Sequence, residues 1–498
     1  VFVSYTGHAL DTKTSLLRSI GSLNKEALKL LSAIGEKGIK EVWATIGCEQ
    51  EYFLIDESFV KARPDLLLSG RTLFGADMPK GQQLEDHYFG SIPTRVQAYM
   101  VEAEQELYRL GIPVKTRHNE VAPSQFETAP IFEEANIAAD HNMMTMEILR
   151  KVAERHGFTC LLHEKPFAGV NGSGKHNNWS MATDNGLNLL EPGKTPAANF
   201  RFIAVLSCVL NAVYKNQVAL RAAIAGHGND HRLGANEAPP AIISVFVGSM
   251  LTKILETIDK GEDLSKISAE RALIEFGLHQ LPALPKDTTD RNRTSPFAFT
   301  GNKFEFRAVG SSQAISFPVS ILNTAVAESM KEFVTALEAK KSKAASLEIA
   351  VLETAQEFIR KSKKILFEGN GYSEEWRQEA KKRGLYELLK TPDALEAFAK
   401  KEHHQFLVEG GVFKAEEIEA LIHVKAEQYV KNLDIEAQTM CTMARQYVIP
   451  SARTLQSRMA ESLRDLEALN ISQKNQKEFL IKLSGLIEET YGAVEVLN

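Results

Sequence analysis

The chain of 498 residues is long enough for two or more domains with full hydrophobic cores, and its composition, 44% hydrophobic and 24% charged, is ordinary for a globular protein. The formal net charge of −6 argues against nucleic-acid binding as the main task, because a phosphate backbone attracts a basic surface. We expect neither a signal peptide nor a membrane partner, since the longest charge-poor stretches, 202–214 and 241–251, are too short to span a bilayer, and we therefore expect a cytoplasmic protein.

The cysteines are far apart in the sequence and form no CxxC pair; they are Cys48, Cys160, Cys208 and Cys441. This pattern indicates reduced, mostly buried thiols that behave as small hydrophobic residues. Because the chain begins at Val1 rather than at a methionine, we also expect that an N-terminal portion precedes it.

The first part of the chain alternates between helix and strand signals. Leucines at helical spacing predict a helix over residues 12–35 that ends at Gly35, and the β-branched and aromatic run 42–53 predicts a strand. Glycines mark the ends of two further predicted helices. The other elements predicted up to residue 178 are helices over 92–110 and 131–156, a strand over 159–163 and a loop over 166–178.

The middle of the chain is more apolar. Long helices are predicted over residues 197–226 and 240–261, on either side of a polar loop over 226–239. A Thr- and Arg-rich segment over 287–296 precedes a predicted strand over 303–309. Strands and helices that mix without a strict βαβ rhythm favour an α+β fold with an antiparallel sheet.

From about residue 317 the strand signals vanish, and segments rich in Lys, Glu, Ala and Leu predict helices. We therefore expect one domain over residues 1–316 and a helical C-terminal region over 317–498. A single buried stripe is predicted there, which indicates core or subunit contact rather than a cofactor site; its members are Leu455, Met459, Leu463 and Leu466.

Glu49 and Glu51 are two residues apart in the predicted strand 42–53, so both side chains would point to the same face, about 7 Å apart. That separation suits ligands for two neighbouring metal ions. The alternative is a polar strand face with exposed glutamates. Each glutamate taken alone is unremarkable, and the metal hypothesis depends on the ligands that follow.

Glu120 and Glu127 flank a turn that Pro123 forces, and His176 and Glu305 lie in other turn-rich or apolar segments. Ionised carboxylates repel one another, so their convergence requires cations. Oxygen ligands suit Mg²⁺ or Mn²⁺, and one imidazole favours Mn²⁺ without excluding Mg²⁺. The six candidate ligands therefore predict a metal-dependent enzyme that handles phosphates.

The loop over 171–176, Asn-Gly-Ser-Gly-Lys-His, contains glycines that let the backbone approach a ligand closely. It lacks the spacing of a P-loop, and a generic glycine-rich turn is the alternative. Arg232, Arg293 and Arg307 could bind carboxylate or phosphate oxygens through their forked guanidinium groups, or form surface salt bridges. Glu237, in a predicted loop, could accept a proton, bind a cation or be an exposed carboxylate.

Several segments together resemble one known family, glutamine synthetase, in the family's own order. The match covers roughly residues 40–310, and the combination is highly specific although no single motif is. The wording NEAPPAII and the long helical tail are most similar to the large type III bacterial branch. The matching segments are EQEYFLID (49–56), HYFGSIP (87–93), HNEVAPSQFE (118–127), KPFAGVNGSGKH (165–176), HRLGANEAP (231–239), DRNRT (290–294) and KFEFR (303–307).

The resemblance implies ATP-dependent ligation of ammonia to glutamate through γ-glutamyl phosphate, with two or more Mg²⁺ or Mn²⁺ ions per site. It implies a catalytic domain over 1–316 and assembly into hexameric rings, with a dodecamer as the expected form. Its carried-over site residues fall into four groups: Glu51, Glu120 and Glu127 for the first metal and Glu49, His176 and Glu305 for the second; Asn171, Gly172, Arg232 and Arg307 for glutamate; Phe132, Ser180, Lys303 and Arg293 for the nucleotide and transferring phosphoryl group; Glu237 for the ammonium proton, with Tyr88 beside it.

The sequence departs from the family pattern at several positions. Arg232 and Glu237 are five positions apart where about six are usual, and Lys303 stands where an arginine is common. Ala298 occupies the place of a phosphate-binding arginine, so ATP contacts must come from elsewhere, and Asn178 replaces a histidine near the nucleotide. The family's N-terminal β-grasp domain, which lends an aspartate to the neighbouring subunit, has no counterpart in these residues.

Two other functions remain open from the sequence. The first is a ligase on the same scaffold that couples glutamate to a polyamine or another amine, because amine choice depends on the pocket around Glu237. The second is a non-catalytic scaffold protein derived from such an enzyme, which would have lost ligand carboxylates.

Overall fold

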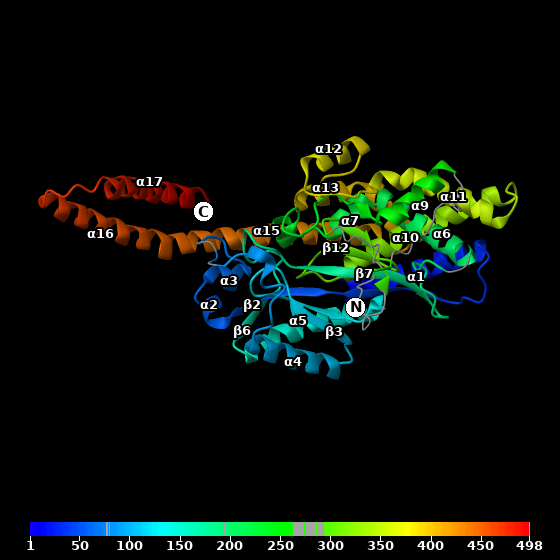
Figure 1. Ribbon diagram of the computed structural model, residues 1–498, viewed down its shortest axis with the longest axis horizontal. Helices are drawn as coiled ribbons and strands as arrows, with labels where there is room; N and C mark the ends of the chain where they lie inside the picture. The colour runs from blue at the N-terminus through cyan, green and yellow to red at the C-terminus, as the bar shows by residue number, and fades with distance from the viewer. Residues whose placement is uncertain are drawn as a thin grey trace.

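The computed structural model describes residues 1–75, 78, 80–193, 196–261, 273–274, 284–285 and 293–497 (Figure 1). Its strands form a six-stranded sheet in the order β5-β1-β7-β12-β11-β8, a four-stranded sheet in the order β3-β4-β2-β6, and a pair, β10-β9. The strands are β1 (Val42–Cys48), β2 (Gln50–Asp56), β3 (Val114–Asn119), β4 (Gln125–Pro130), β5 (Glu133–Glu134), β6 (Phe158–Leu161), β7 (Gly174–Thr183), β8 (Val245–Phe246), β9 (Leu273–Ile274), β10 (Leu284–Pro285), β11 (Phe297–Phe299) and β12 (Phe304–Gly310).

The strand pairs are antiparallel apart from β11 and β8, which run parallel. The predicted α+β class with an antiparallel sheet is therefore confirmed. The helices that precede the last strand are α1 (Thr12–Ala33), α2 (Glu57–Lys61), α3 (Pro64–Ser69), α4 (Thr94–Arg109), α5 (Ala135–Arg155), α6 (Pro196–Lys215), α7 (Gln217–Ala223), α8 (His227–Arg232) and α9 (Ser249–Lys260).

The predicted single strand over 42–53 is wrong, because the chain changes sheets in the middle of it. β1 pairs with β7 in the large sheet, whereas β2 pairs with β4 and β6 in the small one. Glu49 lies at the crossing, where its backbone N–H donates to the carbonyl of His176 at 3.1 Å. The crossing places two glutamates of one short segment at the junction between the two sheets.

Each sheet has its own hydrophobic core. The large sheet packs with α1, α6 and α10 (Ser316–Lys341), and fully buried Leu16, Trp179, Val209 and Ile321 belong to this core. The small sheet packs with α4 and α5 through Tyr52 and other apolar side chains. Figure 1 shows α4 and α5 on the side of the molecule opposite α6, α10 and α11 (Leu347–Ser362). The junction between the sheets thus lies between the two hydrophobic cores.

Helix α1 begins after Asp11, whose carboxylate accepts a hydrogen bond from the Thr14 N–H at 2.8 Å, as an N-cap residue does. Gly35 follows its end with φ +93°, a left-handed conformation that glycine adopts without strain. The predicted helix over 12–35 is confirmed to within two residues, and α4 likewise matches the prediction over 92–110.

Other predicted elements need correction. The loop predicted over 166–178 is shorter, because β7 begins at Gly174 and places His176 on a strand. The helix predicted over 131–156 starts at Ala135, after the short strand β5. The helix predicted over 197–226 is broken at Asn216 into α6 and α7, which bend by 76°.

The helix predicted over 240–261 is also wrong in its first half. Residues 240–248 are extended and contain β8, and only α9 is helical. Val245 and Val247 belong to the core of the large sheet, whereas Ile242 packs with Trp376 on α12 (Glu374–Arg383). An apolar run has the same sequence pattern in either setting. The polar loop predicted over 226–239 contains the short helix α8. Of the Thr- and Arg-rich segment 287–296, residues 287–292 lie outside the described residues.

No single helix among the described residues is long and apolar enough to cross a membrane; α6 and α7 pass such a test only as a bent pair. The four cysteines are buried and free, as predicted.

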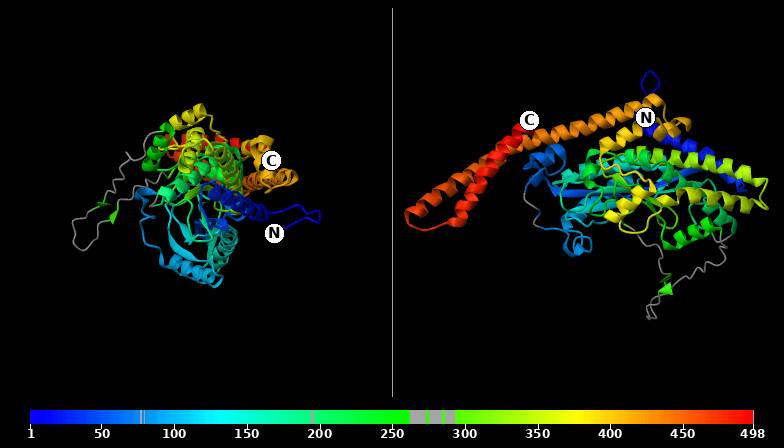
Figure 2. Two further views of the ribbon diagram at one scale, coloured as in Figure 1. Left: turned by 90° about the vertical axis from the view of Figure 1, so that its right-hand side faces the viewer. Right: turned by 90° about the horizontal axis from the view of Figure 1, so that it is seen from above.

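After β12 the described residues form helices and no further strand. These helices, besides α10, are α11 (Leu347–Ser362), α12 (Glu374–Arg383), α13 (Thr391–Ala399), α14 (Lys401–Glu409), α15 (Ala415–Met443), α16 (Ile449–Ala468) and α17 (Lys474–Leu497). The right-hand view of Figure 2 shows α16 and α17 as a hairpin that extends well beyond the rest of the chain.

The buried stripe predicted on residues 455–466 is only partly present. Leu463 is buried, but Leu455 is 46% exposed. Among the described residues α16 packs mainly on α17 and on the π-helical segment Ala444–Val448 before it, which leaves Leu455 exposed. The apolar spacing predicted a stripe but not which of its residues a neighbouring helix covers.

Candidate active site

Every site residue predicted from the sequence lines one cavity of about 800 Å³ at the junction of the two sheets. Its size is in the range of small-molecule sites. The predicted residues on its walls are Glu49, Glu51, Tyr88, Glu120, Glu127, Phe132, Asn171, Gly172, His176, Ser180, Arg232, Glu237, Arg293, Lys303, Glu305 and Arg307.

Three buried carboxylates meet on the side of the small sheet. Glu51 on β2 lies directly opposite Glu127 on β4, and Glu120 follows the end of β3. Burial, then the neighbouring Glu127, raises the pKa of Glu51 to about 7. Burial, then Glu51 and Glu127, raises the pKa of Glu120 well above its ordinary value. Without a cation, this cluster binds protons at a pH where free glutamates are ionised.

A second group of predicted ligands lies on the side of the large sheet. The carboxylate of Glu49 lies 3.0 Å from the Nδ1 atom of His176. Burial opposes protonation of His176, but the contact with Glu49 and the field of that carboxylate raise its pKa to about 9. Glu305 on β12 is held by Arg307, whose Nε and Nη2 atoms donate to one carboxylate oxygen at 3.0 and 2.8 Å.

The donor set fits divalent cations. Carboxylate oxygens dominate it, as Mg²⁺ and Mn²⁺ prefer, and one donor per residue of His118, Glu120 and Glu127 can lie within 4.8 Å of one another. Burial is the largest cause of the raised pKa values of Glu51 and Glu120, and repulsion from neighbouring carboxylates adds to it. A cation in place of the protons would relieve that repulsion.

The glycines before and at the start of β7 are required by close contacts. A Cβ atom on Gly172 would lie 2.3 Å from the carbonyl oxygen of Glu164, and one on Gly174 would lie 2.1 Å from the guanidinium of Arg232. The Gly174 N–H in turn donates to Glu51 at 2.6 Å. The glycine-rich segment therefore brings backbone against the carboxylates and leaves no room for side chains, unlike a generic turn.

Arg232 is buried and projects from α8 towards the cavity. Its Nη atoms donate to the backbone carbonyl of Arg307 at 3.0 Å and to the side chain of Asn229 at 3.2 Å. Its Nε atom has no hydrogen-bond partner in the part of the chain that the structure describes. Asn171 donates from Nδ2 to Glu237 at 3.0 Å. Donors for a carboxylate substrate thus lie beside the predicted proton acceptor.

Glu237, Arg293 and Tyr88 form one cluster at the mouth of the cavity. The Nη1 atom of Arg293 donates to Glu237 at 2.6 Å, and its guanidinium lies 6.0 Å from the centre of the Tyr88 ring. Asn236 and Glu237 have φ of +52° and +65°. Such left-handed conformations are uncommon outside glycine and cluster at functional sites, where surrounding contacts hold them.

The predicted nucleotide-binding residues Phe132 and Ser180 also line the cavity. The ring of Phe132 is 65% exposed, as a stacking surface for a planar ligand would be. The hydroxyl of Ser180 donates to the carbonyl of Asn302 at 3.0 Å. Asn178 donates to Glu49 at 2.8 Å. Ala298 is buried on β11 and is not among the lining residues, so an arginine-like contact does not arise there.

His118 is the clearest site residue that we missed. It lies opposite Glu127 in the sheet, with its Nε2 atom 2.9 Å from that carboxylate. The contact with Glu127 raises the pKa of His118 to about 9. Its place within the segment HNEVAPSQFE, two residues before Glu120, was the signal that could have found it. Gln125, which donates to the carbonyl of Gly172 at 2.9 Å, was missed as well.

Comparisons with known proteins find family models that match two parts of the chain. A family model described as the glutamine synthetase catalytic domain matches residues 25–212, and one described as the glutamine synthetase C-terminal domain matches residues 350–467. Among solved structures, the chain is similar to one titled "Apo GmaS without ligand", with a TM-score of 0.48 and 18% identity, covering 84% of this chain and 73% of that one.

Three curated relatives match most of the chain. It is 48% identical to the type-3 glutamine synthetase of Dictyostelium discoideum, covering 95% of this chain and 64% of that protein. It is 46% identical to a glutamine synthetase of Bacteroides fragilis, covering 97% and 67%, and 50% identical to one of Butyrivibrio fibrisolvens, covering 89% and 62%. The chain therefore spans about two thirds of the length of these relatives.

Proposed function

Because the chain belongs to the glutamine synthetase family, we propose that it ligates ammonia to L-glutamate at the expense of ATP, giving L-glutamine, ADP and phosphate. The observation that supports this proposal most strongly is the single cavity that all the predicted metal, glutamate, nucleotide and catalytic residues line. A non-catalytic scaffold protein is disfavoured, because the six predicted ligand side chains are all present on its walls.

In the proposed reaction a γ-carboxylate oxygen of glutamate attacks the γ-phosphorus of ATP, and ADP leaves. The nitrogen of ammonia then attacks the carbonyl carbon of γ-glutamyl phosphate, and phosphate leaves. Asn171, Gly172, Arg232 and Arg307 would bind glutamate, and Phe132, Ser180 and Lys303 would contact the nucleotide. Fixing both substrates in one cavity makes the attack effectively intramolecular.

Glu51, Glu120 and Glu127 would hold one Mg²⁺ or Mn²⁺ ion, and Glu49, His176 and Glu305 another. Bound divalent ions would neutralise charge on the phosphates and on the attacked carboxylate. Arg293 would stabilise the transferring phosphoryl group. Glu237, oriented by Arg293 and Asn171, would take the proton of ammonium, with Tyr88 beside it. By closing the mouth of the cavity these residues would also keep water from the acyl phosphate.

A rival within the same fold is a ligase that couples glutamate to a larger amine. The rate of phosphate release, measured with saturating ATP, Mg²⁺ and glutamate, distinguishes the two functions. Ammonium, methylamine and spermidine are compared as the amine substrate. We expect ammonium to give the highest kcat/KM, with glutamine as the product. A higher kcat/KM for either amine would assign the rival function.

Assembly belongs to the same proposal: a cytoplasmic homo-oligomer built from hexameric rings, with a dodecamer as the expected form. Residues 1–316 would carry the reaction, and the helices of 317–498 would supply subunit contacts. In support, the hairpin of α16 and α17 exposes Leu455, Phe479 and Ile481 at 46%, 50% and 67%. Exposed apolar residues gathered on one element mark an interaction surface.

Light scattering after size-exclusion chromatography tests the assembly. We expect Ile481→Lys to lower the mass of the particle, because a charge would be buried at an apolar contact. Gln476→Lys, at an exposed polar position of the same helix, serves as the control and should leave the mass unchanged. A monomeric parent protein, or equal effects of both substitutions, would contradict a role of the hairpin in assembly.

A further inference from the structure

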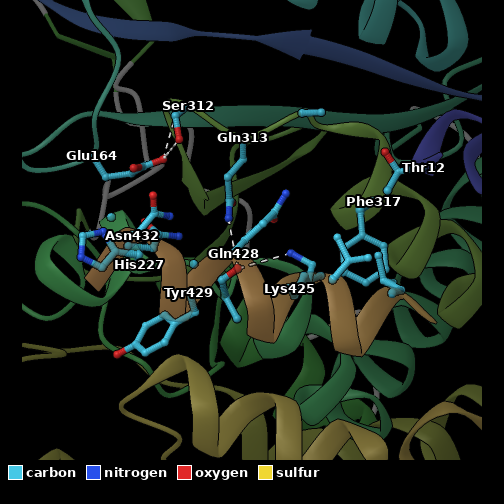
Figure 3. Close-up of a pocket in the computed structure, with 18 of the residues that line it drawn as sticks. Thr12, Glu164, His227, Ser312, Gln313, Phe317, Lys425, Gln428, Tyr429 and Asn432 are labelled. Carbon is cyan, nitrogen blue, oxygen red and sulfur yellow. Dashed lines mark hydrogen bonds between the residues drawn. The ribbon is translucent and has the colours of Figure 1, made fainter. Parts of the chain in front are cut away.

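A second cavity, of about 790 Å³, lies between α15 and the body of the protein (Figure 3). One wall is α15; the other is formed by the start of α1, the end of β6, the start of α8 and the turn at Ser312 and Gln313. None of its lining residues lines the candidate active site. Its volume is again that of a small-molecule site.

The acidic side chains of this second cavity are already satisfied within the protein. Glu417 pairs with Arg18 at 2.7 Å, and Glu436 accepts from Arg71 at 2.9 Å. Glu164 accepts from both the N–H and the hydroxyl of Ser312, at 3.0 and 2.6 Å. Asp11 is occupied as the cap of α1. The cavity therefore offers little unsatisfied negative charge to a ligand.

Two cations line the cavity without a carboxylate partner. Among the described residues, half-buried Lys425 and exposed Arg150 form no ion pair. Figure 3 shows Lys425 projecting from α15 into the cavity, on the side facing Gln313. The amides of Gln428 and Asn432 line the same space and add hydrogen-bond donors. Lys425 and Glu164 thus both line the cavity without an ion-pair partner among the described residues, and Figure 3 shows them on different parts of its wall.

Lys425 is poorly satisfied where it stands. Its ammonium donates to the carbonyl of Ala225 at a long 3.4 Å and lies 5.1 Å from the centre of the Phe317 ring. Burial lowers its pKa to about 8, so the ammonium is still mostly charged at pH 7. Lys425 is half-buried, so its ammonium keeps some contact with solvent, and a bound anion would give it the charged hydrogen bond that it lacks.

A cation site at the other end of the cavity is the competing interpretation, because donors of His163, His227 and Glu436 come close together. Hydrogen bonding argues against it. The Nδ1 atom of His163 accepts from the backbone N–H of Lys165 at 2.9 Å, so neutral His163 carries its proton on Nε2. That nitrogen then has no lone pair for a metal ion, and Glu436 is already bound by Arg71.

We propose that the second cavity binds a small organic anion with an apolar body, with its anionic group against Lys425 and Arg150 and its body against Phe317 and Leu421. The anionic group is a carboxylate or a phosphate. This site goes beyond the proposed function and does not depend on it. It lies directly behind the candidate active site, because α8 carries His227 and Asn229 on the wall of one cavity and Arg232 on the wall of the other.

Isothermal titration of the intact protein with three probes tests the proposal. Benzoate and phenyl phosphate share an aromatic body and differ in the anionic group, and benzyl alcohol supplies the body without charge. We expect at least one anion to bind in preference to benzyl alcohol. The stronger of the two anions identifies the group that the cavity selects.

Lys425→Met removes the ammonium and keeps the chain length; Lys431→Met, on the same helix but paired with Glu427 and outside the cavity, is its control. We expect Lys425→Met to weaken anion binding about tenfold or more, as loss of a charged hydrogen bond does, and Lys431→Met to leave it unchanged. Arg150→Met provides a second variant if Lys425→Met fails to fold.

Three results would overturn the proposal: no binding of either anion, equal binding of benzyl alcohol, or unchanged anion binding in the variants of Lys425 and Arg150. Glu51→Gln, which alters only the candidate active site, should retain anion binding. Failure of the proposed ligase activity would therefore be distinguishable from failure of this site.

Discussion

Glu51→Gln is expected to lower the rate of glutamine formation about a hundredfold or more and to weaken Mn²⁺ binding, because the substitution removes one anionic ligand from the cluster of Glu51, Glu120 and Glu127. The side chain keeps its size, so the cavity keeps its shape. Steady-state kinetics at several Mn²⁺ concentrations and direct titration with Mn²⁺ measure the two effects. Glu57→Gln, at a half-buried position just after the same strand and outside the cavity, is the control.

The same substitution should have the opposite effect on stability without metal. The folded-state pKa of Glu51 is raised from 4.5 to about 7, so this residue favours folding at low pH and that contribution is lost as pH rises from 4.5 through 7. The raised pKa values of His118 and His176 act in the same direction up to about 9. A glutamine cannot ionise, and it removes one of the mutually repelling charges.

In the presence of EDTA we therefore expect the Tm of the parent protein to fall between pH 5 and pH 8, and that of Glu51→Gln to fall by several degrees less. Added Mn²⁺ should raise the Tm of the parent at pH 8 more than that of the variant. Near-normal activity of Glu51→Gln together with unchanged Mn²⁺ affinity would remove this residue from the metal site.

The second large effect is expected for Glu237→Gln. The carboxylate is held by Arg293 at 2.6 Å and Asn171 at 3.0 Å, and its backbone has a φ of +65°. A glutamine keeps the shape but cannot take a proton, so kcat should fall about a hundredfold or more, the usual contribution of a general base. Mn²⁺ affinity should stay unchanged, because Glu237 is not among the predicted ligands.

A rise of pH distinguishes this role from a purely structural one. Free ammonia becomes abundant at high pH, so Glu237→Gln should recover part of its activity there, whereas a misfolded site would not. The exposed Glu154→Gln on α5 is the matched control. Equal kcat values for Glu237→Gln and the parent at neutral pH would exclude the proton-accepting role.

The resemblance to the family was confirmed, and local signals predicted several elements well. Helices with clear stop signals, such as those ending near Gly35 and Gly111, appeared where the spacing placed them. The segment 42–53 did not, because its pattern indicates extended backbone but cannot tell which neighbours each half pairs with. The change of sheet at Glu49 is a tertiary event, and it is the feature that positions Glu49 and Glu51 at the cavity.

Longer-range partners explain the other differences. The apolar run 240–248 contains β8, which pairs with β11, so a helical prediction failed there. Leu455 was predicted as buried from its spacing, yet it is 46% exposed in one chain. His118 was not among the predicted ligands, although it lies on β3 directly opposite Glu127.

If four separated segments enclose a pair of divalent ions, crystals grown with Mn²⁺ and measured at the manganese absorption edge should reveal both. We expect two anomalous peaks in one cavity, one among Glu51, Glu120 and Glu127 and the other among Glu49, His176 and Glu305. A cavity without anomalous signal at saturating Mn²⁺ would rule out this metal site.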